Sequence, residues 1–129
     1  MDGRCSLRLT RRYAASPAEV WEALTLPESL AGWLGNAQLE LVAGGGLDLE
    51  LLDGTRVTGQ VRTIDPRRLL ELDWAAHGEE PSVVRFELAA DGAGTLLRLE
   101  HRLLEERLGM RYLARWEGAI RRLTEERVR

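Results

Sequence analysis

The stretch "VTGQVRTIDPRRLLELDW", from Val57 to Trp74, predicts two antiparallel strands joined by a tight turn. Strand-forming residues alternate with polar ones on both sides of Asp65-Pro66, a dipeptide typical of turns. Gly59 lies in the middle of the first strand. Because glycine weakens a strand interior, its presence indicates a bend or a place where something else must fit. We interpret Gly59 as leaving room beside the large ring of Trp74.

The same alternation of apolar and polar residues continues outward in both directions. Leu47 and Leu49, for example, share one face of a strand, and the Asp53-Gly54 pair that follows is typical of a hairpin turn. The pattern predicts strands over residues 5–16, 37–43, 47–54, 55–64, 69–76, 82–92 and 94–103. So many alternating neighbours indicate an antiparallel sheet with one polar face and one covered face.

Helices are predicted at two places in the chain. Ser16, Pro17 and Glu19 form a capping-box signature for a short helix, which Pro27 separates from a second short helix that ends at Gly35. The segment from about Glu105 to Arg127 forms one long helix. Its apolar stripe is Leu108, Tyr112, Trp116, Ile120 and Leu123. Strand, two short helices, six strands and a long helix make residues 1–129 a single α+β domain.

Composition excludes several classes of function. The net charge of −3 gives no general attraction to nucleic acid. Because apolar runs are short and the N-terminus lacks a signal-peptide core, we expect a cytoplasmic protein without a membrane span. Cys5 is the single cysteine and there are two histidines, too few ligands for a zinc site. All 18 basic residues are arginines, a codon-usage trait of GC-rich, bacterial genomes. No cofactor motif is present, and we expect none to be bound.

Four phrases, in this order along the chain, resemble the START-like (SRPBCC, Bet v-like) superfamily. They are "SPAEVWEALTLPESLAGWLG", "VTGQVRTIDPRRLLELDW", "VVRFELAADGAGTLLRLEH" and a final helix centred on Trp116. Within it the chain is most similar to the family related to the C-terminal domain of the activator of the 90-kDa heat-shock-protein ATPase. This resemblance implies the helix-grip fold, a curved antiparallel sheet of about seven strands wrapped on a long C-terminal helix. The eukaryotic chaperone activator has a further N-terminal domain that engages the chaperone. This sequence contains no counterpart, so we do not expect the family name to give the function.

A helix-grip fold can leave a pocket between its sheet and its long helix, and the alternation assigns residues to that inner face. Pockets for apolar ligands are lined by such side chains, with a few polar groups that orient the ligand. The predicted ligand-binding residues are Trp33, Leu49, Gly59, Val61, Leu72, Trp74, Phe86, Leu99, His101, Tyr112 and Trp116. The competing interpretation is that these residues simply pack on one another.

Catalytic residues are not predicted. His101 ends the apolar row that begins at Leu97, so it should face inward, either hydrogen-bonded to backbone or orienting a ligand. The carboxylates at positions 48, 50, 71, 73, 87 and 100 all fall on the outer face by parity. No inward carboxylate is therefore left to pair with His101 in a triad or an acid–base dyad.

We expect a binding module for a small hydrophobic or amphipathic ligand. A cyclase or aromatase-like enzyme of a biosynthetic pathway, and an accessory that acts on a chaperone or regulator by protein interaction, remain alternatives. An arginine series on the last helix (Arg107, Arg111, Arg115 and Arg122) is interpreted as a solvated face, with an acidic protein partner as its alternative. A homodimer is weakly favoured, through a free strand edge or the short helices.

Overall fold

The computed structural model describes residues 3–126, and its order of elements is the predicted one. Strand β1 (Arg4–Tyr13) is followed by helices α1 (Pro17–Thr25) and α2 (Pro27–Trp33). Six strands come next: β2 (Gly35–Leu39), β3 (Gly46–Leu51), β4 (Arg56–Asp65), β5 (Leu69–Ala76), β6 (Ser82–Asp91) and β7 (Gly94–Glu105). A short 3-10 turn, η1 (Glu106–Leu108), leads into α3 (Gly109–Glu126). Arg127, the predicted end of the long helix, lies outside the described residues.

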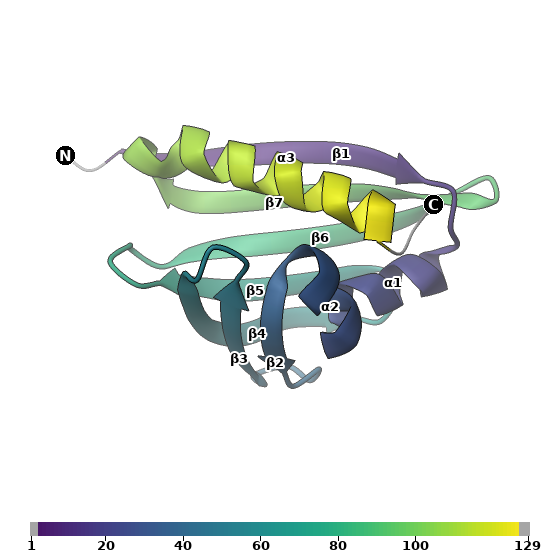
Figure 1. Cartoon of the computed structure of the whole chain (residues 1–129), viewed down its shortest axis with the longest axis horizontal. Coiled ribbons are helices and arrows are strands. Elements are labelled where there is room, and N and C mark those ends of the chain that lie inside the picture. Colours follow the sequence, from purple (N-terminus) through teal and green to yellow (C-terminus); the bar gives the residue numbers. More distant parts are fainter. Residues whose placement is uncertain (1–2, 127–129) are drawn as a thin grey trace.

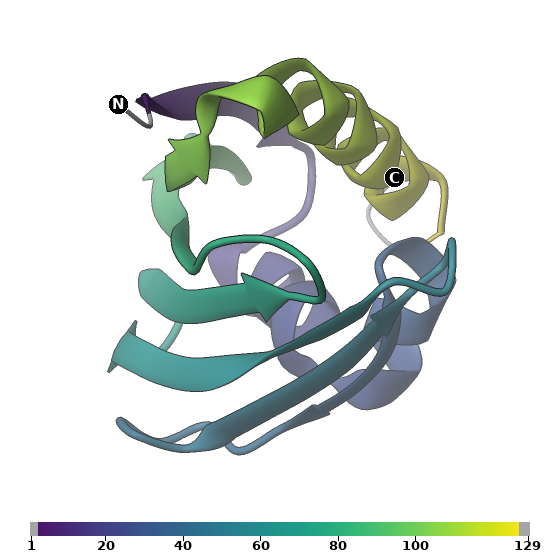
Figure 2. The same ribbon diagram turned by 90° about the vertical axis from the view of Figure 1, so that its left-hand side faces the viewer.

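The seven strands form one antiparallel sheet in the order β1-β7-β6-β5-β4-β3-β2. Strand β1 pairs with β7, so the first and last strands along the chain lie side by side in the sheet. The sheet curls, and α3 lies on its concave side together with α1 and α2 (Figures 1 and 2). This is the α+β helix-grip architecture that the alternation and the resemblance predicted.

The two short helices begin where the sequence predicted. Ser16 accepts a hydrogen bond from the Glu19 amide, while the Glu19 side chain accepts one from the Ser16 amide. This capping box satisfies amide groups that have no partner inside the helix. Pro17 and Pro27 each stand in the first turn of a helix, where a missing N–H costs nothing.

Helix α3 contributes one apolar side to the core. Tyr112, Trp116, Ala119, Ile120 and Leu123 are buried, whereas Met110 is 79% exposed. These residues recur at steps of three and four, so they form one stripe along the helix. The stripe faces the concave side of the sheet, whose inward residues on β3 to β7 are buried as well.

Strand β2 ends earlier than predicted. The alternation suggested a strand over residues 37–43, but β2 stops at Leu39 and a turn follows. Gly44 has a positive φ of 82°, and the Gly45 amide donates to the carbonyl of Val42. The turn therefore includes the last apolar residues of the predicted strand, Leu41 and Val42, and leaves Val42 exposed.

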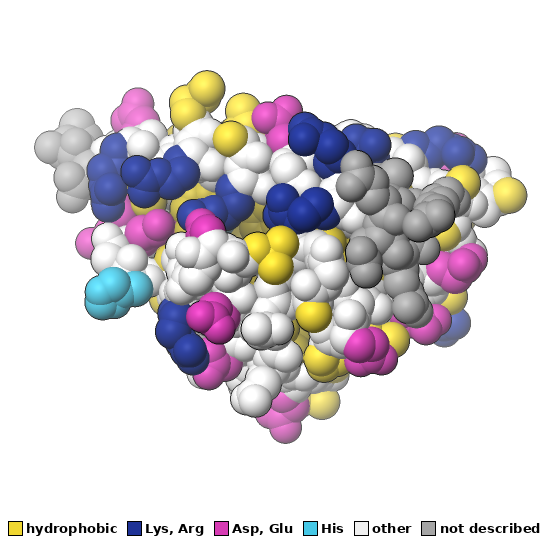
Figure 3. Space-filling view, in the orientation of Figure 1, with side chains coloured by type: hydrophobic (Ala, Val, Ile, Leu, Met, Phe, Trp, Pro, Cys, Tyr) yellow, Lys and Arg dark blue, Asp and Glu magenta, His cyan; other side chains and the backbone are white. Residues whose placement is uncertain are grey.

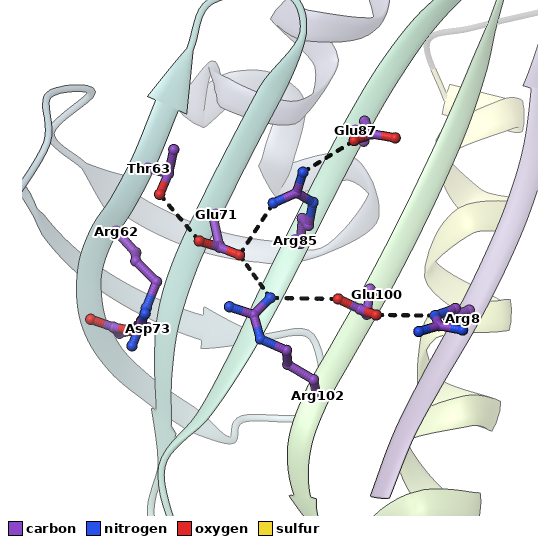
Figure 4. Close-up of polar contacts among 9 residues, drawn as sticks. All are labelled: Arg8, Arg62, Thr63, Glu71, Asp73, Arg85, Glu87, Glu100 and Arg102. Atoms are coloured by element: carbon purple, nitrogen blue, oxygen red, sulfur yellow. Dashed lines mark hydrogen bonds and ion pairs between the residues drawn. The ribbon is translucent and has the colours of Figure 1, made fainter.

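The convex face of the sheet carries a chain of ion pairs (Figure 4). Arg102 Nη1 lies 2.7 Å from Glu71 Oε2, and Arg85 Nη1 lies 3.5 Å from the same oxygen. Thr63 donates a hydrogen bond to the other carboxylate oxygen at 3.1 Å. Glu71 is only 6% exposed, although it is on the outer face as predicted, because these arginine side chains cover it. Burial alone would raise the pKa of Glu71, but the hydrogen bond and charge of Arg102 hold it below its ordinary value.

Candidate functional site

The predicted ligand-binding residues lie in the core, and part of the set forms one aromatic cluster. Every member except Gly59 is buried. The Trp74 and Trp116 ring centroids are 5.5 Å apart, and those of His101 and Tyr112 are 4.6 Å apart. Phe86 meets Trp116 edge to face at 5.9 Å. Five of the predicted residues therefore contact one another as packed rings.

The polar atoms of this cluster bind one another. Trp74 Nε1 donates to the Tyr112 hydroxyl at 3.1 Å, and that hydroxyl donates to Glu79 Oε1 at 2.6 Å. Burial, together with the Glu79 carboxylate, raises the pKa of Tyr112 well above its ordinary value. Glu79 comes from the loop between β5 and β6, so the contact ties that loop to α3. The rings thus pack and hydrogen-bond with one another on the inner face that the sequence assigned to a ligand.

His101 is held between two neutral partners. Trp116 Nε1 lies 3.0 Å from His101 Nδ1, and Ser82 Oγ lies 2.7 Å from His101 Nε2. An indole nitrogen can only donate, so Nδ1 is the unprotonated acceptor and Nε2 carries the proton. Burial, reinforced by the positive charge of Arg115, lowers the pKa of His101 to about 3. The expectation that His101 faces inward is confirmed, and its partners are side chains instead of backbone.

This tautomer bears on catalysis. A serine beside a histidine is the pairing used for nucleophilic hydrolysis, but the imidazole must then accept the serine proton. Here the Nε2–H donates toward Ser82, and the other ring nitrogen is occupied by Trp116. His101 and Ser82 are also fully buried. The pair therefore holds the cluster together and lacks the protonation state of a general base.

Gly59 does not have the surroundings that the sequence suggested. A Cβ atom at this position would collide with the backbone carbonyl of Asp73 on β5, not project into space beside Trp74 and Trp116. The pairing of β4 with β5 is irregular just beyond, between Val61 and Thr63. The interpretation of Gly59 as leaving room for a ligand is wrong: glycine is needed because two backbones approach closely.

Trp33 lies apart from the aromatic cluster. Its indole N–H donates to the carbonyl of Ala23 at 2.8 Å, which joins α2 to α1. Its own carbonyl accepts a hydrogen bond from Arg122 Nε at 3.1 Å, which joins α2 to α3. Trp33 therefore fixes the three helices relative to one another at one end of the core.

A hollow opens on the surface between α3, the end of α2 and the β3–β4 turn; we call it the α3 groove. Its volume is about 370 Å³. Its lining residues are Leu34, Leu51, Leu52, Asp53, Ala114, Arg115, Gly118, Ala119 and Arg122. In Figure 3 dark blue side chains follow the course of α3, with hydrophobic side chains beside them. Leu52, at the rim, is 54% exposed.

Arg115 lines the α3 groove, although it was not among the residues predicted to form a site. Its Nη2 lies 2.7 Å from Asp53 Oδ2, and its guanidinium carbon lies 5.0 Å from the centroid of the Tyr112 ring. Its side chain is 19% exposed, and Nη1 is buried without a hydrogen-bond partner among the described residues. Its position between Tyr112 and Trp116 in the stripe was the available signal. The arginine series to which it belongs was interpreted as solvated instead.

Other kinds of site are not found in the described part of the chain. Within it, no group of three or more His, Cys, Asp or Glu side chains is placed to hold a metal ion. None of its helices has the length and apolar character to cross a membrane. The α3 groove combines an apolar lining with two arginines beside the long helix, and it is the candidate site for a ligand.

Comparisons with known proteins agree with the fold. The profile of the family described as "Activator of Hsp90 ATPase homolog 1-like protein" matches residues 14–126. CalU16 from Micromonospora echinospora is 30% identical, with a TM-score of 0.85, and the match covers 97% of this chain and 82% of CalU16. No curated protein sequence matches the chain.

Two more distant structures share the fold. DynU16, a protein in the dynemicin biosynthetic locus, is 24% identical with a TM-score of 0.85, over 93% of this chain and 46% of DynU16. PFC0360w, an Hsp90 activator from Plasmodium falciparum, is 18% identical with a TM-score of 0.77, over 95% of this chain and 94% of that protein. With the profile match spanning nearly the whole described chain, this protein belongs to the family of Activator of Hsp90 ATPase homolog 1-like proteins.

Proposed function

We propose that this protein binds a small hydrophobic or amphipathic ligand between the sheet and α3, with the α3 groove as the place of binding. The observation that carries the proposal is the groove itself, about 370 Å³ in volume and lined mainly by apolar side chains. Ligand pockets usually fall between about 300 and 1,000 Å³ and combine an apolar lining with a few polar groups. The apolar lining includes Leu51, Leu52 and Ala114. The polar groups are those of Arg115 and Arg122.

The groove adjoins the aromatic cluster that the sequence assigned to ligand binding. Arg115 lies against the Tyr112 ring, and the Tyr112 hydroxyl accepts from Trp74. Arg115 and Tyr112 thus stand between the groove and Trp74. In this proposal Tyr112 is the predicted ligand-binding residue behind the groove, although none of the predicted set lines it, and rearrangement of Tyr112 would open a path toward Trp74.

Binding is better supported than a cyclase or aromatase-like reaction. Both ring nitrogens of His101 already have partners, and the burial that lowers its pKa keeps it neutral. The outer carboxylates, of which Glu71 is the most buried, lie on the opposite face of the sheet. No acid–base pair therefore faces the groove from the described core.

The test is a titration with Nile red, a neutral apolar dye, of the wild type and two variants. Ala114 is an exposed residue of the groove lining, so Ala114→Trp should fill the groove without disturbing the core. We expect dye binding to weaken about tenfold, because apolar area that the dye buried is lost. Met110→Trp adds the same ring to the same helix outside the groove and should leave binding unchanged. Equal binding by both variants would place the dye elsewhere and contradict the proposal.

A further inference from the structure

We propose that the α3 groove selects ligands that carry a carboxylate on an apolar chain, with Arg115 binding the carboxylate and Asp53 competing for the same guanidinium. This inference rests on the proposed function of the groove and specifies the chemical class of its ligand. The side chain of Arg115 is mostly buried in a groove large enough for a ligand. Only some of its N–H groups have hydrogen-bond partners.

The guanidinium of Arg115 is held in place but incompletely bound. Asp53 Oδ2 accepts from Nη2 at 2.7 Å, and the guanidinium carbon lies over the Tyr112 ring, 5.0 Å from its centroid. Nη1, by contrast, is buried without a partner among the side chains that the structure describes, which end at Leu123. A buried donor left unsatisfied costs free energy, so such an atom in a native structure needs an explanation. Nη1 is enclosed while Asp53 holds the guanidinium, so in this proposal an acceptor on a ligand reaches Nη1 only when the ligand displaces Asp53.

The chemistry of the groove favours a carboxylate as that acceptor. Guanidinium groups bind carboxylates through two parallel hydrogen bonds, and the guanidinium of Arg115 already binds one carboxylate, that of Asp53. The remainder of the lining is apolar at Leu34, Leu51 and Leu52, which suits the chain of such a ligand. At the other end of the groove the Arg122 guanidinium lies near Gly118. A Cβ atom added to Gly118 would come 3.3 Å from Nη1 of Arg122. The electrostatic environment is therefore positive along the floor.

Asp53 is placed to act as an exchangeable internal partner. It stands in the β3–β4 turn, where its Oδ1 accepts a hydrogen bond from the Thr55 amide at 2.9 Å. Its side chain is 51% exposed, in contrast to the mostly buried Arg115. Water can solvate Asp53 when a ligand carboxylate replaces it, so the exchange leaves no buried charge unpaired. Asp53 should therefore weaken the binding of anionic ligands and leave neutral ones unaffected.

The experiment compares two probes on the whole chain. One is a medium-chain fatty acid with a fluorescent label at its far end, and the other is the primary amide of the same compound. We expect the wild type to bind the acid about tenfold more tightly, since hydrogen bonds to a charged partner add free energy of this order. Arg115→Met should remove that preference. Asp53→Asn should strengthen binding of the acid several-fold and leave the amide unchanged. Arg111→Met, on the exposed side of α3, is the matched control and should behave as the wild type.

The outcomes separate this inference from the proposed function. If neither probe binds the wild type, the groove does not bind apolar ligands and the proposed function fails. If both probes bind equally, or if Arg115→Met keeps the preference, the carboxylate inference alone is wrong. If Arg115→Met does not fold, the Asp53→Asn variant tests the inference. Tighter binding of the acid probe but not of the amide probe supports the inference, and unchanged binding of the acid overturns it.

Discussion

At the residue scale, Gly59 illustrates how closely the backbones of β4 and β5 approach. Because a Cβ atom there would collide with the Asp73 carbonyl, we expect Gly59→Ala to destabilise the protein by about 1–3 kcal/mol. Urea unfolding measures the difference. Gly46→Ala is the control: a Cβ atom on Gly46 meets nothing within 4 Å, and the change should stay within about 0.5 kcal/mol. A Gly59→Ala variant as stable as the wild type would show that the two strands can separate at no cost.

His101 makes stability depend on pH in a defined direction. The pKa of His101 falls from 6.5 to about 3 on folding, because burial and Arg115 disfavour its charged form. Below pH 6.5 the unfolded chain takes up a proton that the folded protein does not. Stability is therefore complete above pH 6.5 and decreases as the pH falls, by at most about 1.4 kcal/mol per pH unit from this residue.

The range between about pH 5 and 6.5 isolates this effect. The lowered pKa values of Asp53 and Glu71 remove their stabilisation only at lower pH, since the ordinary values are 3.8 and 4.5. We expect the free energy of unfolding of the wild type, measured by urea titration, to fall across this range. His101→Gln retains a donor and an acceptor but does not titrate, so its curve should be flatter. Parallel curves for the two proteins would contradict the assigned protonation state.

At the scale of elements, α3 covers the concave face of the sheet. The apolar side of the helix and the apolar face of the sheet bury each other. Removal of the chain from Glu105 onward would expose the partners of Tyr112, Trp116 and Ile120 on the concave face. We expect insoluble protein, because large contiguous apolar surfaces promote aggregation. The soluble fraction after expression and the cooperativity of thermal unfolding measure this. Met110→Ala, an exposed change on the same helix, should leave both unaltered. A truncated chain that is soluble and unfolds cooperatively would contradict the role of α3.

At the scale of the whole molecule, the sheet ends in β1 on one side and β2 on the other. The outer edge of such a strand has unpaired N–H and C=O groups that a second chain can bind. We predict a homodimer, with twice the chain mass of 14.5 kDa in light scattering at high concentration. A dilution series is the control, since a dimer dissociates as its concentration falls. A species of 14.5 kDa at every concentration would overturn the prediction.

The sequence by itself determined the elements, their order and the face that each presents. Alternation at Leu47 and Leu49, the cap at Ser16 and the stripe through Tyr112 and Trp116 are local signals, because they depend on spacings of two to four residues along the chain. For the same reason the inward position of His101 was predictable, as was the outward position of Glu71. These features follow from the geometry of a strand or a helix, whatever it packs against.

Only the tertiary structure decided what stands opposite each residue. The carbonyl against Gly59, the two partners of His101 and the meeting of Arg115 with Asp53 join strands or segments well separated in sequence. The pairing of strands, the curvature of the sheet and the seating of α3 fix these distances together, so no local pattern encodes them. That is why the ring packing of the predicted pocket and the α3 groove beside it emerged only from the folded chain.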